Sequence, residues 1–217
     1  MTDQHTYSAA DMPNRVVRFD DLKHTGTPLM FIDSILPNHW CMNYAVIGTA
    51  DSGPDAAANR AIAAPHAFQV RMGWAPPGNG PAWHTHDYVE LIVILDGEWR
   101  FAWGYSEDRA RPDGEFILGK WDMISAPAGM WRSFDVVGDG IGWFLAVAEP
   151  HEGSDGRDPR WPPAVVNMAR AAGFHADDSG RLIKAEDYPD VRAAHERRLL
   201  SIFKDVTGVP LPDFRPE

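Results

Sequence analysis

The sequence predicts an all-β fold of short antiparallel strands, on three observations. The chain has 217 residues, 44% of them hydrophobic and 24% charged, which is the composition of one ordinary globular domain. Its 18 Pro and 19 Gly indicate many turns, while 9 Trp and 10 Phe are typical of a pleated core. Short segments of alternating hydrophobicity between residues 67 and 149 complete the pattern of an antiparallel sandwich or small barrel.

The N-terminal part predicts an arm followed by two strands. Residues 1–27 are polar and lack periodicity, so we expect an extended or partly disordered arm. Two apolar segments follow, over residues 28–36 and 39–48. We interpret both as strands of a β-barrel that runs from residue 28 to residue 149.

The densest strand pattern begins at residue 67. Strands are expected over residues 67–74, from residue 90 onward, after Gly97, and over residues 115–118, 122–127, 131–137 and 141–149. In the first of these, Phe68, Val70, Met72 and Trp74 form an apolar face opposite a mixed one. Asp-Gly dipeptides at residues 96, 113 and 139 separate the strands and favour tight hairpins.

The C-terminal part, residues 150–217, predicts a linker and helices. Residues 163–174 and 188–203 have helical patterns, and the second carries an amphipathic stripe through Val191, His195, Leu199 and Ile202. We expect these helices to pack on the barrel. Packing on a partner subunit is the alternative.

Charge and composition exclude several classes of protein. The formal net charge is −11, which argues against binding to nucleic acid or to an anionic membrane. The sequence has no apolar run of transmembrane length and no signal peptide at its start. Cys41 is the single cysteine, so no internal disulfide forms. We therefore expect a cytoplasmic protein with a small-molecule substrate.

Three side chains predict a metal site. His84 and His86 are two apart in a strand, so both point to the same face with Cα atoms about 6–7 Å apart. Glu90 would lie roughly 13 Å from His86 in a straight strand, too far to share an ion. We therefore expect a bend near Asp87 and Tyr88 that brings Glu90 to the site. A hydrogen-bonded cluster without metal is the alternative.

Together with Gly78 and Gly97, these residues match every fixed position of the pattern G(X)5HXH(X)3–4E(X)6G. This is the first motif of the cupin superfamily, which the chain therefore resembles. The resemblance implies a jelly-roll β-barrel, a homodimer, and a divalent metal ion on His84, His86 and Glu90. Iron is the first choice of metal, with Mn, Ni or Zn as alternatives. Two His and one carboxylate with open positions are typical of non-haem Fe(II) oxygenases.

The second cupin motif is matched only in part. Pro127 and Gly129 are present, but Trp121 replaces a glycine, the final Asn is absent, and Arg132 stands where the fourth ligand, usually His, is expected. A guanidinium stays protonated and offers no lone pair, and at 4 Å it repels another positive centre by about 4 kcal/mol. Either Arg132 points away, or an anion lies between it and the metal, or the metal is weak or absent. His151 is an alternative ligand.

These observations favour a metal-dependent oxygenase of the dioxygenase type that acts on a small organic substrate. Arg132 would neutralise developing negative charge, and Tyr88 would supply a proton. An isomerase, lyase or decarboxylase with the metal as Lewis acid is the first alternative. The second is a non-catalytic small-molecule-binding barrel. That alternative predicts an apolar pocket and an internal salt bridge from Arg132 to an acidic residue. The candidate partners are Asp122, Asp135 and Glu90.

Overall fold

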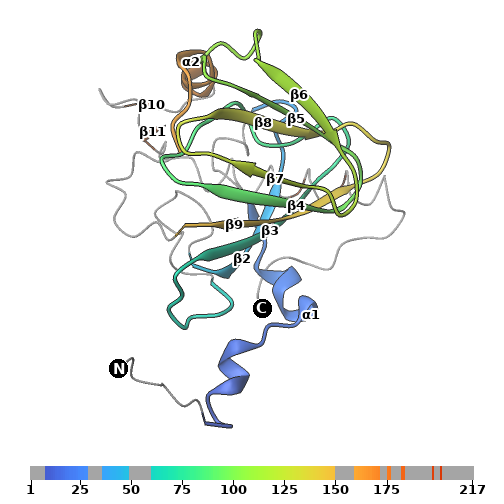
Figure 1. The fold of residues 1–217 in the computed structure, drawn as a ribbon, viewed down its shortest axis with the longest axis vertical. Coiled ribbons are helices and arrows are strands. Elements are labelled where there is room, and N and C mark those ends of the chain that lie inside the picture. Colours follow the sequence, from blue (N-terminus) through green and yellow to red (C-terminus); the bar gives the residue numbers. More distant parts are fainter. Residues whose placement is uncertain are drawn as a thin grey trace.

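The structure is a computed structural model. It describes residues 8–28, 36–48, 60–149 and 159–171, together with residues 175–176, 182–183, 197 and 201. Two antiparallel sheets make up most of this part, and they face each other in Figure 1. None of the helices in the described part of the chain is long and apolar enough to cross a membrane.

The larger sheet has the strand order β1-β2-β3-β9-β4-β7. Its strands are β1 (Thr27–Pro28), β2 (Met42–Ile47), β3 (Gln69–Ala75), β9 (Gly142–Ala148), β4 (Glu90–Asp96) and β7 (Met123–Ala126). The smaller sheet has the order β6-β5-β8, from β6 (Gly114–Leu118), β5 (Trp99–Gly104) and β8 (Trp131–Val136). A separate two-stranded ladder joins β10 (His175–Ala176) to β11 (Leu182–Ile183).

The connections between strands make this a jelly roll. Consecutive strands β4 and β5, β6 and β7, and β8 and β9 lie in different sheets, so the chain crosses repeatedly between the two layers. The predicted jelly-roll fold is therefore confirmed. The expected tight hairpins at residues 96 and 139 are wrong, because these Asp-Gly turns carry the chain from one sheet to the other. β5 and β6 do pair with each other, through a longer loop.

The apolar face of β3 does not line the barrel interior. Trp74 pairs in register with Met42 and Trp143, and it belongs to a buried cluster with Leu22 and Tyr44. Leu22 ends the short helix α1 (Phe19–Leu22), which lies between the helical turns η1 (Met12–Arg15) and η2 (Lys23–Thr25). The N-terminal arm thus covers the outer face of the larger sheet.

The interior between the sheets changes character along its length. β4 contributes Ile92 and Ile94 to the core, and β8 contributes Phe134. The Phe134 ring lies 5.2 Å from that of Phe144 in an edge-on contact and 6.0 Å from that of Phe101 in a stacked one, measured between centroids. One pleat repeat earlier on the same two strands the inward residues are Glu90 and Arg132, which are both buried and charged.

The helix α2 (Pro163–Ala171) confirms the first predicted C-terminal helix. Val165, Val166 and Ala169 are buried in the main core, as is Trp161 just before the helix. Its place at one end of the barrel is seen in Figure 1. The second predicted helix, 188–203, lies outside the described residues except at Arg197 and Ser201, which are helical.

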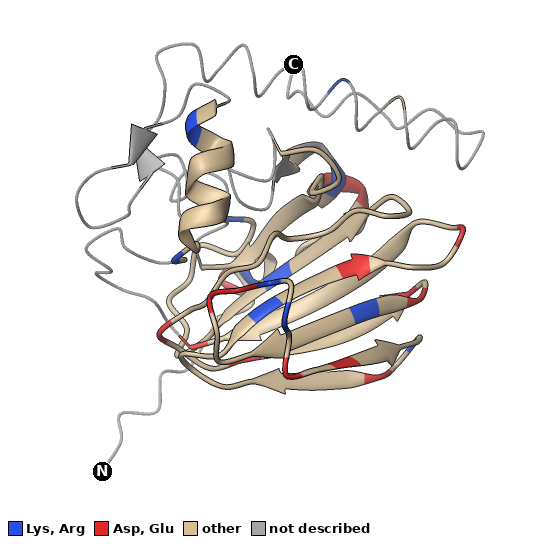
Figure 2. Ribbon diagram, turned by 90° about the horizontal axis from the view of Figure 1, so that it is seen from above, with Lys and Arg blue, Asp and Glu red and all other residues tan. Residues whose placement is uncertain are grey.

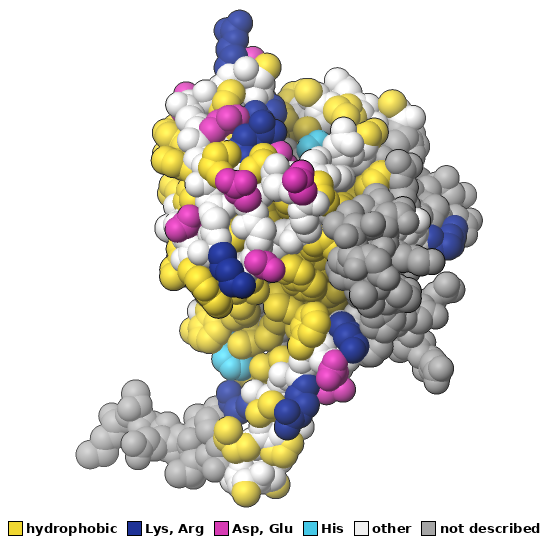
Figure 3. All heavy atoms as spheres, turned by 90° about the vertical axis from the view of Figure 1, so that its right-hand side faces the viewer, with side chains coloured by type: hydrophobic (Ala, Val, Ile, Leu, Met, Phe, Trp, Pro, Cys, Tyr) yellow, Lys and Arg dark blue, Asp and Glu magenta, His cyan; other side chains and the backbone are white. Residues whose placement is uncertain are grey.

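The surface mixes charges and apolar areas. Lys and Arg are interspersed with Asp and Glu over the barrel, and several acidic residues lie in the loops between strands (Figure 2). On the face shown in Figure 3, hydrophobic side chains gather over the lower half of the barrel, toward the N-terminal arm.

Candidate functional site

The chain bends where the sequence requires it. His84 and Thr85 form isolated bridges to Arg132 and Arg160, Asp87 and Tyr88 form a bend, and β4 begins at Glu90. The predicted bend is confirmed. It turns Glu90 back toward the histidines from a strand of the opposite sheet.

The two histidines lie together and are buried. Their ring centroids are 4.9 Å apart with the planes at 73°, and the exposed fractions of His84 and His86 are 2% and 4%. His84 Nδ1 lies 2.6 Å from the carbonyl oxygen of Ala82, so this nitrogen carries the proton and donates it. Tyr88 stacks on His86 with centroids 4.5 Å apart.

Arg132 forms a buried ion pair with Glu90. Its Nη2 donates to Glu90 Oε2 at 3.0 Å and its Nη1 donates to the Met130 carbonyl at 3.2 Å. The Arg132 residue is completely buried and Glu90 is 5% exposed. Backbone bonds of 2.8 and 2.9 Å fix Arg132 directly opposite His84. The guanidinium therefore holds the carboxylate that was expected to share an ion with the two histidines.

The other two acidic residues considered for Arg132 have different partners. Asp135 accepts a bidentate pair from Arg100 on the outer face of the smaller sheet, at 2.9 Å for the closest contact. Asp122 accepts a hydrogen bond from the backbone N–H of Gly119 at 2.8 Å. Glu90 is thus the acidic partner of Arg132.

Charge and burial set the protonation states of the site. Burial holds the pKa of His86 well below its ordinary value, and the nearby Arg132 guanidinium lowers it further. Burial alone would raise the pKa of Glu90, but the nearby guanidinium charges, that of Arg132 above all, lower it below its ordinary value. The cluster therefore holds a neutral His86 and an ionised Glu90 at neutral pH.

The donor set does not fit a metal ion in this arrangement. Within residues 8–28, 36–48, 60–149 and 159–171, no group of three or more His, Cys, Asp or Glu side chains comes together in a way that could hold one. Arg132 binds Oε2 of Glu90, so the guanidinium already balances the negative charge that would favour a dication there. The metal site predicted on His84, His86 and Glu90 is not assembled. The alternative ligand His151 lies outside the described residues.

Two residues of the site were missed from the sequence. Arg71 and Gln69 lie on the mixed face of β3, which turns inward and pairs with Ala146 and Ala148 of β9. Arg71 Nη2 donates to the Tyr88 hydroxyl at 3.1 Å and lies 3.5 Å from Gln69 Oε1. Tyr88, expected to supply a proton, thus has its oxygen engaged as an acceptor. The polar residues among β3's apolar ones were the available signal.

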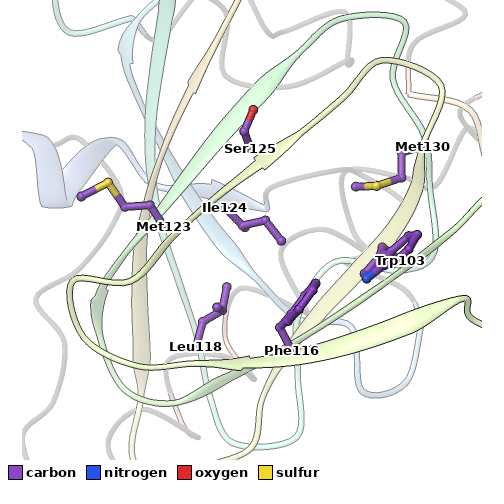
Figure 4. Close-up of a pocket in the computed structure, with 7 residues that line it drawn as sticks. All are labelled: Trp103, Phe116, Leu118, Met123, Ile124, Ser125 and Met130. Carbon is purple, nitrogen blue, oxygen red and sulfur yellow. The ribbon is translucent and has the colours of Figure 1, made fainter.

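An apolar pocket opens beside the ion pair, between β6 and β7. Its volume is about 410 Å³. Its walls are drawn in Figure 4: Trp103, Phe116, Leu118, Met123, Ile124, Ser125 and Met130. Trp103 pairs in register with Arg132, and Ile124 lies one pleat repeat from Ala126, the partner of Glu90. Cross-strand partners of this kind have Cβ atoms about 4.5–5.5 Å apart, so the pocket adjoins the buried pair. No sequence motif predicted it.

Comparisons with known proteins give weak likenesses. No family model matches the chain, and no curated protein matches it. Among solved structures, a cupin-2 domain of Rhodospirillum rubrum has a TM-score of 0.42 at 17% identity, covering 73% of this chain and 83% of its own. A cupin 2 domain-containing protein of Halorhodospira halophila has a TM-score of 0.42 at 15% identity, covering 61% and 80%.

A third similar structure is a double-stranded β-helix protein of Klebsiella pneumoniae, with a TM-score of 0.42 at 17% identity, covering 64% of this chain and 93% of its own. At this level of similarity the neighbours' activities carry no weight for this chain. The fold is established by its own strand order, and the chemistry of the site by its own side chains.

Proposed function

We propose that this chain, which has the jelly-roll fold and the complete first motif of cupins, binds a small organic molecule in its barrel without using a metal ion. The observation that supports this is the buried Arg132–Glu90 pair at 3.0 Å. An apolar pocket next to that pair supplies the space for a ligand. Both features are those expected for the small-molecule-binding barrel.

The guanidinium of Arg132 supplies the positive charge that a metal ion would otherwise supply to the buried Glu90 carboxylate. A buried carboxylate beside two imidazoles is costly unless a positive charge compensates it. Arg132 supplies that charge from within the chain, directly opposite His84. A dication entering the site would compete with Arg132 for Glu90. At 4 Å and an effective dielectric of 20 it would meet a repulsion of about 8 kcal/mol from the guanidinium, twice that between two unit charges.

Metal loading tests this proposal. The protein, purified without added metal, is equilibrated anaerobically with Fe(II), and separately with Mn, Ni and Zn, and its metal content is measured after desalting. We expect a content far below one ion per chain. Arg132→His would place an imidazole opposite His84, and we expect it to raise the content to about one ion per chain, the stoichiometry of a closed ligand set.

The matched control is the double variant His84→Ala/Arg132→His, which removes one ligand from the new site and should lose the gained metal. Circular dichroism of each variant checks that the barrel is folded. Stoichiometric metal in the wild-type protein that His84→Ala removes would overturn the proposal.

A metal-dependent enzyme is the second candidate, and one observation favours it. His84 donates Nδ1–H to a backbone carbonyl, which is how metal-ligating histidines are commonly oriented with Nε2 toward the ion. In this candidate the chemistry is that of an oxygenase, or of an isomerase, lyase or decarboxylase. Fe(II)-treated protein is incubated with a panel of phenols and diketones, and both oxygen consumption and loss of substrate are measured. Oxygen consumption identifies an oxygenase, and loss of substrate without oxygen consumption identifies an isomerase, lyase or decarboxylase. If no compound is turned over, the binding barrel is favoured.

The homodimer and the cytoplasmic location remain predictions. Sedimentation equilibrium of the full chain measures the first. Several large apolar side chains near the β6–β7 connection are exposed, as a subunit contact would require: Phe116, Ile117, Trp121 and Met123.

A further inference from the structure

Two buried N–H groups, one on a residue that lines the pocket and one on its cross-strand partner, have no hydrogen-bond partner. They are Trp103 Nε1 and Arg132 Nε, and each is shielded from solvent. Buried donors in folded proteins are almost always paired, with protein, water or a ligand. Because two such donors lie unpaired on neighbouring strands, we expect a hydrogen-bond acceptor to bind next to them.

The two donors lie next to each other on one face. Trp103 of β5 and Arg132 of β8 are direct cross-strand partners, so their side chains leave the sheet on the same side. That side is the interior, because Arg132 reaches Glu90 of the opposite sheet. Trp103 itself forms one wall of the pocket in Figure 4, and Met130, whose carbonyl accepts from Arg132, forms another.

The rest of the pocket is apolar. Phe116, Leu118, Met123 and Ile124 surround it, with Ser125 as a polar side chain among the lining residues. Gly114 allows the indole to lie flat against β6, because a Cβ at that position would come within 2.9 Å of Trp103 Nε1. A ligand that fills this space needs an apolar body.

We propose that the ligand of this pocket is a neutral organic carbonyl compound, a ketone or ester with an apolar body, whose oxygen accepts hydrogen bonds from Trp103 Nε1 and Arg132 Nε. The inference rests on the proposed function and adds the chemical class of the ligand. A neutral oxygen suits the site because the charge of Arg132 is already balanced by Glu90. A carboxylate would bring an additional charge into a buried site.

Three probes of similar shape test the proposal on the full chain: 4-phenyl-2-butanone, butylbenzene and 3-phenylpropionate. Binding is followed by titration in ¹H–¹⁵N spectra, in which the Trp103 indole N–H signal is assigned by its loss in Trp103→Phe. We expect the ketone to shift that signal and to bind about tenfold more tightly than butylbenzene, a modest gain for two hydrogen bonds because binding also costs the ketone its hydrogen bonds to water. We expect 3-phenylpropionate to bind more weakly than the ketone.

Variants locate the effect. Trp103→Phe keeps an aromatic ring and removes the donor, so it should lower ketone affinity more than butylbenzene affinity and thereby reduce the tenfold preference. Trp99→Phe is the matched control, because Trp99 Nε1 already donates to the Asp96 carbonyl at 3.2 Å; it should preserve the preference for the ketone. The wild-type probe comparison stands without either variant.

Each other outcome contradicts the inference. Equal affinities for the ketone and butylbenzene would show that the donors are not used, while ligand binding itself would stand. Tighter binding of 3-phenylpropionate would replace the neutral class with an acidic one. Binding of no probe would remove the pocket as the ligand site. The metal-loading experiment judges the metal-independent proposal separately, so the two failures are distinguishable.

Discussion

The two ends of the barrel interior are built on the same strands but differ in chemistry: one is charged and the other is apolar. At one end, β4 and β8 contribute Glu90 and Arg132. One pleat repeat further on, the inward residues are Ile92 and Phe134, which pack into an apolar and aromatic core. Burial is nearly complete at both ends, so exposure does not distinguish them.

The comparison separates stability from chemistry. The aromatic end gains free energy from every contact, because burying apolar area and filling space are both favourable. The polar end at best breaks even, since the attraction within a buried ion pair is offset by the loss of hydration. A polar end that contributes little net stability, yet is fully built, is therefore the end where function should be sought.

The largest effect is expected at the aromatic end. Phe134→Ala removes a buried ring that contacts Trp99, Phe101 and Phe144, and should lower the free energy of unfolding by about 3–5 kcal/mol. Urea denaturation followed by circular dichroism measures it. Phe116→Ala, at a ring that is 50% exposed, is the control and should cost far less. Similar costs for the two variants would contradict the division into two ends.

The polar end should show a different signature. Arg132→Met leaves the Glu90 carboxylate buried and unpaired, and should cost about 3 kcal/mol. The double variant Glu90→Gln/Arg132→Met removes both charges and should return to within about 1 kcal/mol of wild type. Arg100→Met, in the partly exposed pair with Asp135, should cost less than about 1 kcal/mol. A double variant as unstable as the single one would show that the pair stabilises the fold by itself.

The smallest effect is a pH dependence that belongs to the polar end. Burial lowers the pKa of His86 in the folded protein, so below pH 6.5 the unfolded chain binds a proton there that the folded chain does not. The free energy of unfolding should therefore fall as the pH drops below 6.5, by at most about 1.4 kcal/mol per pH unit for this one proton.

His86→Phe keeps a ring against Tyr88 and removes the titrating group, so it should flatten that part of the profile. Burial lowers the pKa of His39 as well, so His39→Gln is the matched control and measures the contribution of a histidine outside the cluster. Identical slopes for wild type and His86→Phe between pH 6.5 and 5 would refute the assignment.

Much of the fold could be predicted from the sequence because the signals are local. The expected strands from residue 67 to residue 149 are all present, and the bend at Asp87 and Tyr88 was predicted from the requirement that Glu90 reach the two histidines. The tight hairpins failed for a physical reason. An Asp-Gly turn fixes only its own backbone, and the partner of each following strand depends on contacts that are distant in sequence.

The site was harder to predict because it depends on which faces and strands meet. The sequence left three candidate acidic partners for Arg132, and the one with which it pairs, Glu90, is 42 residues away. The apolar face of β3 gave no indication that it packs outward against the arm and leaves Arg71 inside. Alternation identifies two faces, but a strand with a core on each side does not reveal which one is which.

Gly80, which the first motif leaves free, has a consequence for how the sequence can vary. A Cβ at this position would overlap the backbone carbonyl oxygen of Phe134, and neither main chain can move aside without disturbing the strand that carries Arg132. At Gly78, a fixed position of the motif, φ is +71° but no atom lies within 4 Å of the place a Cβ would take, so asparagine or aspartate fits. In a saturation library scored for folded protein, codon 80 should therefore admit fewer replacements than codon 78.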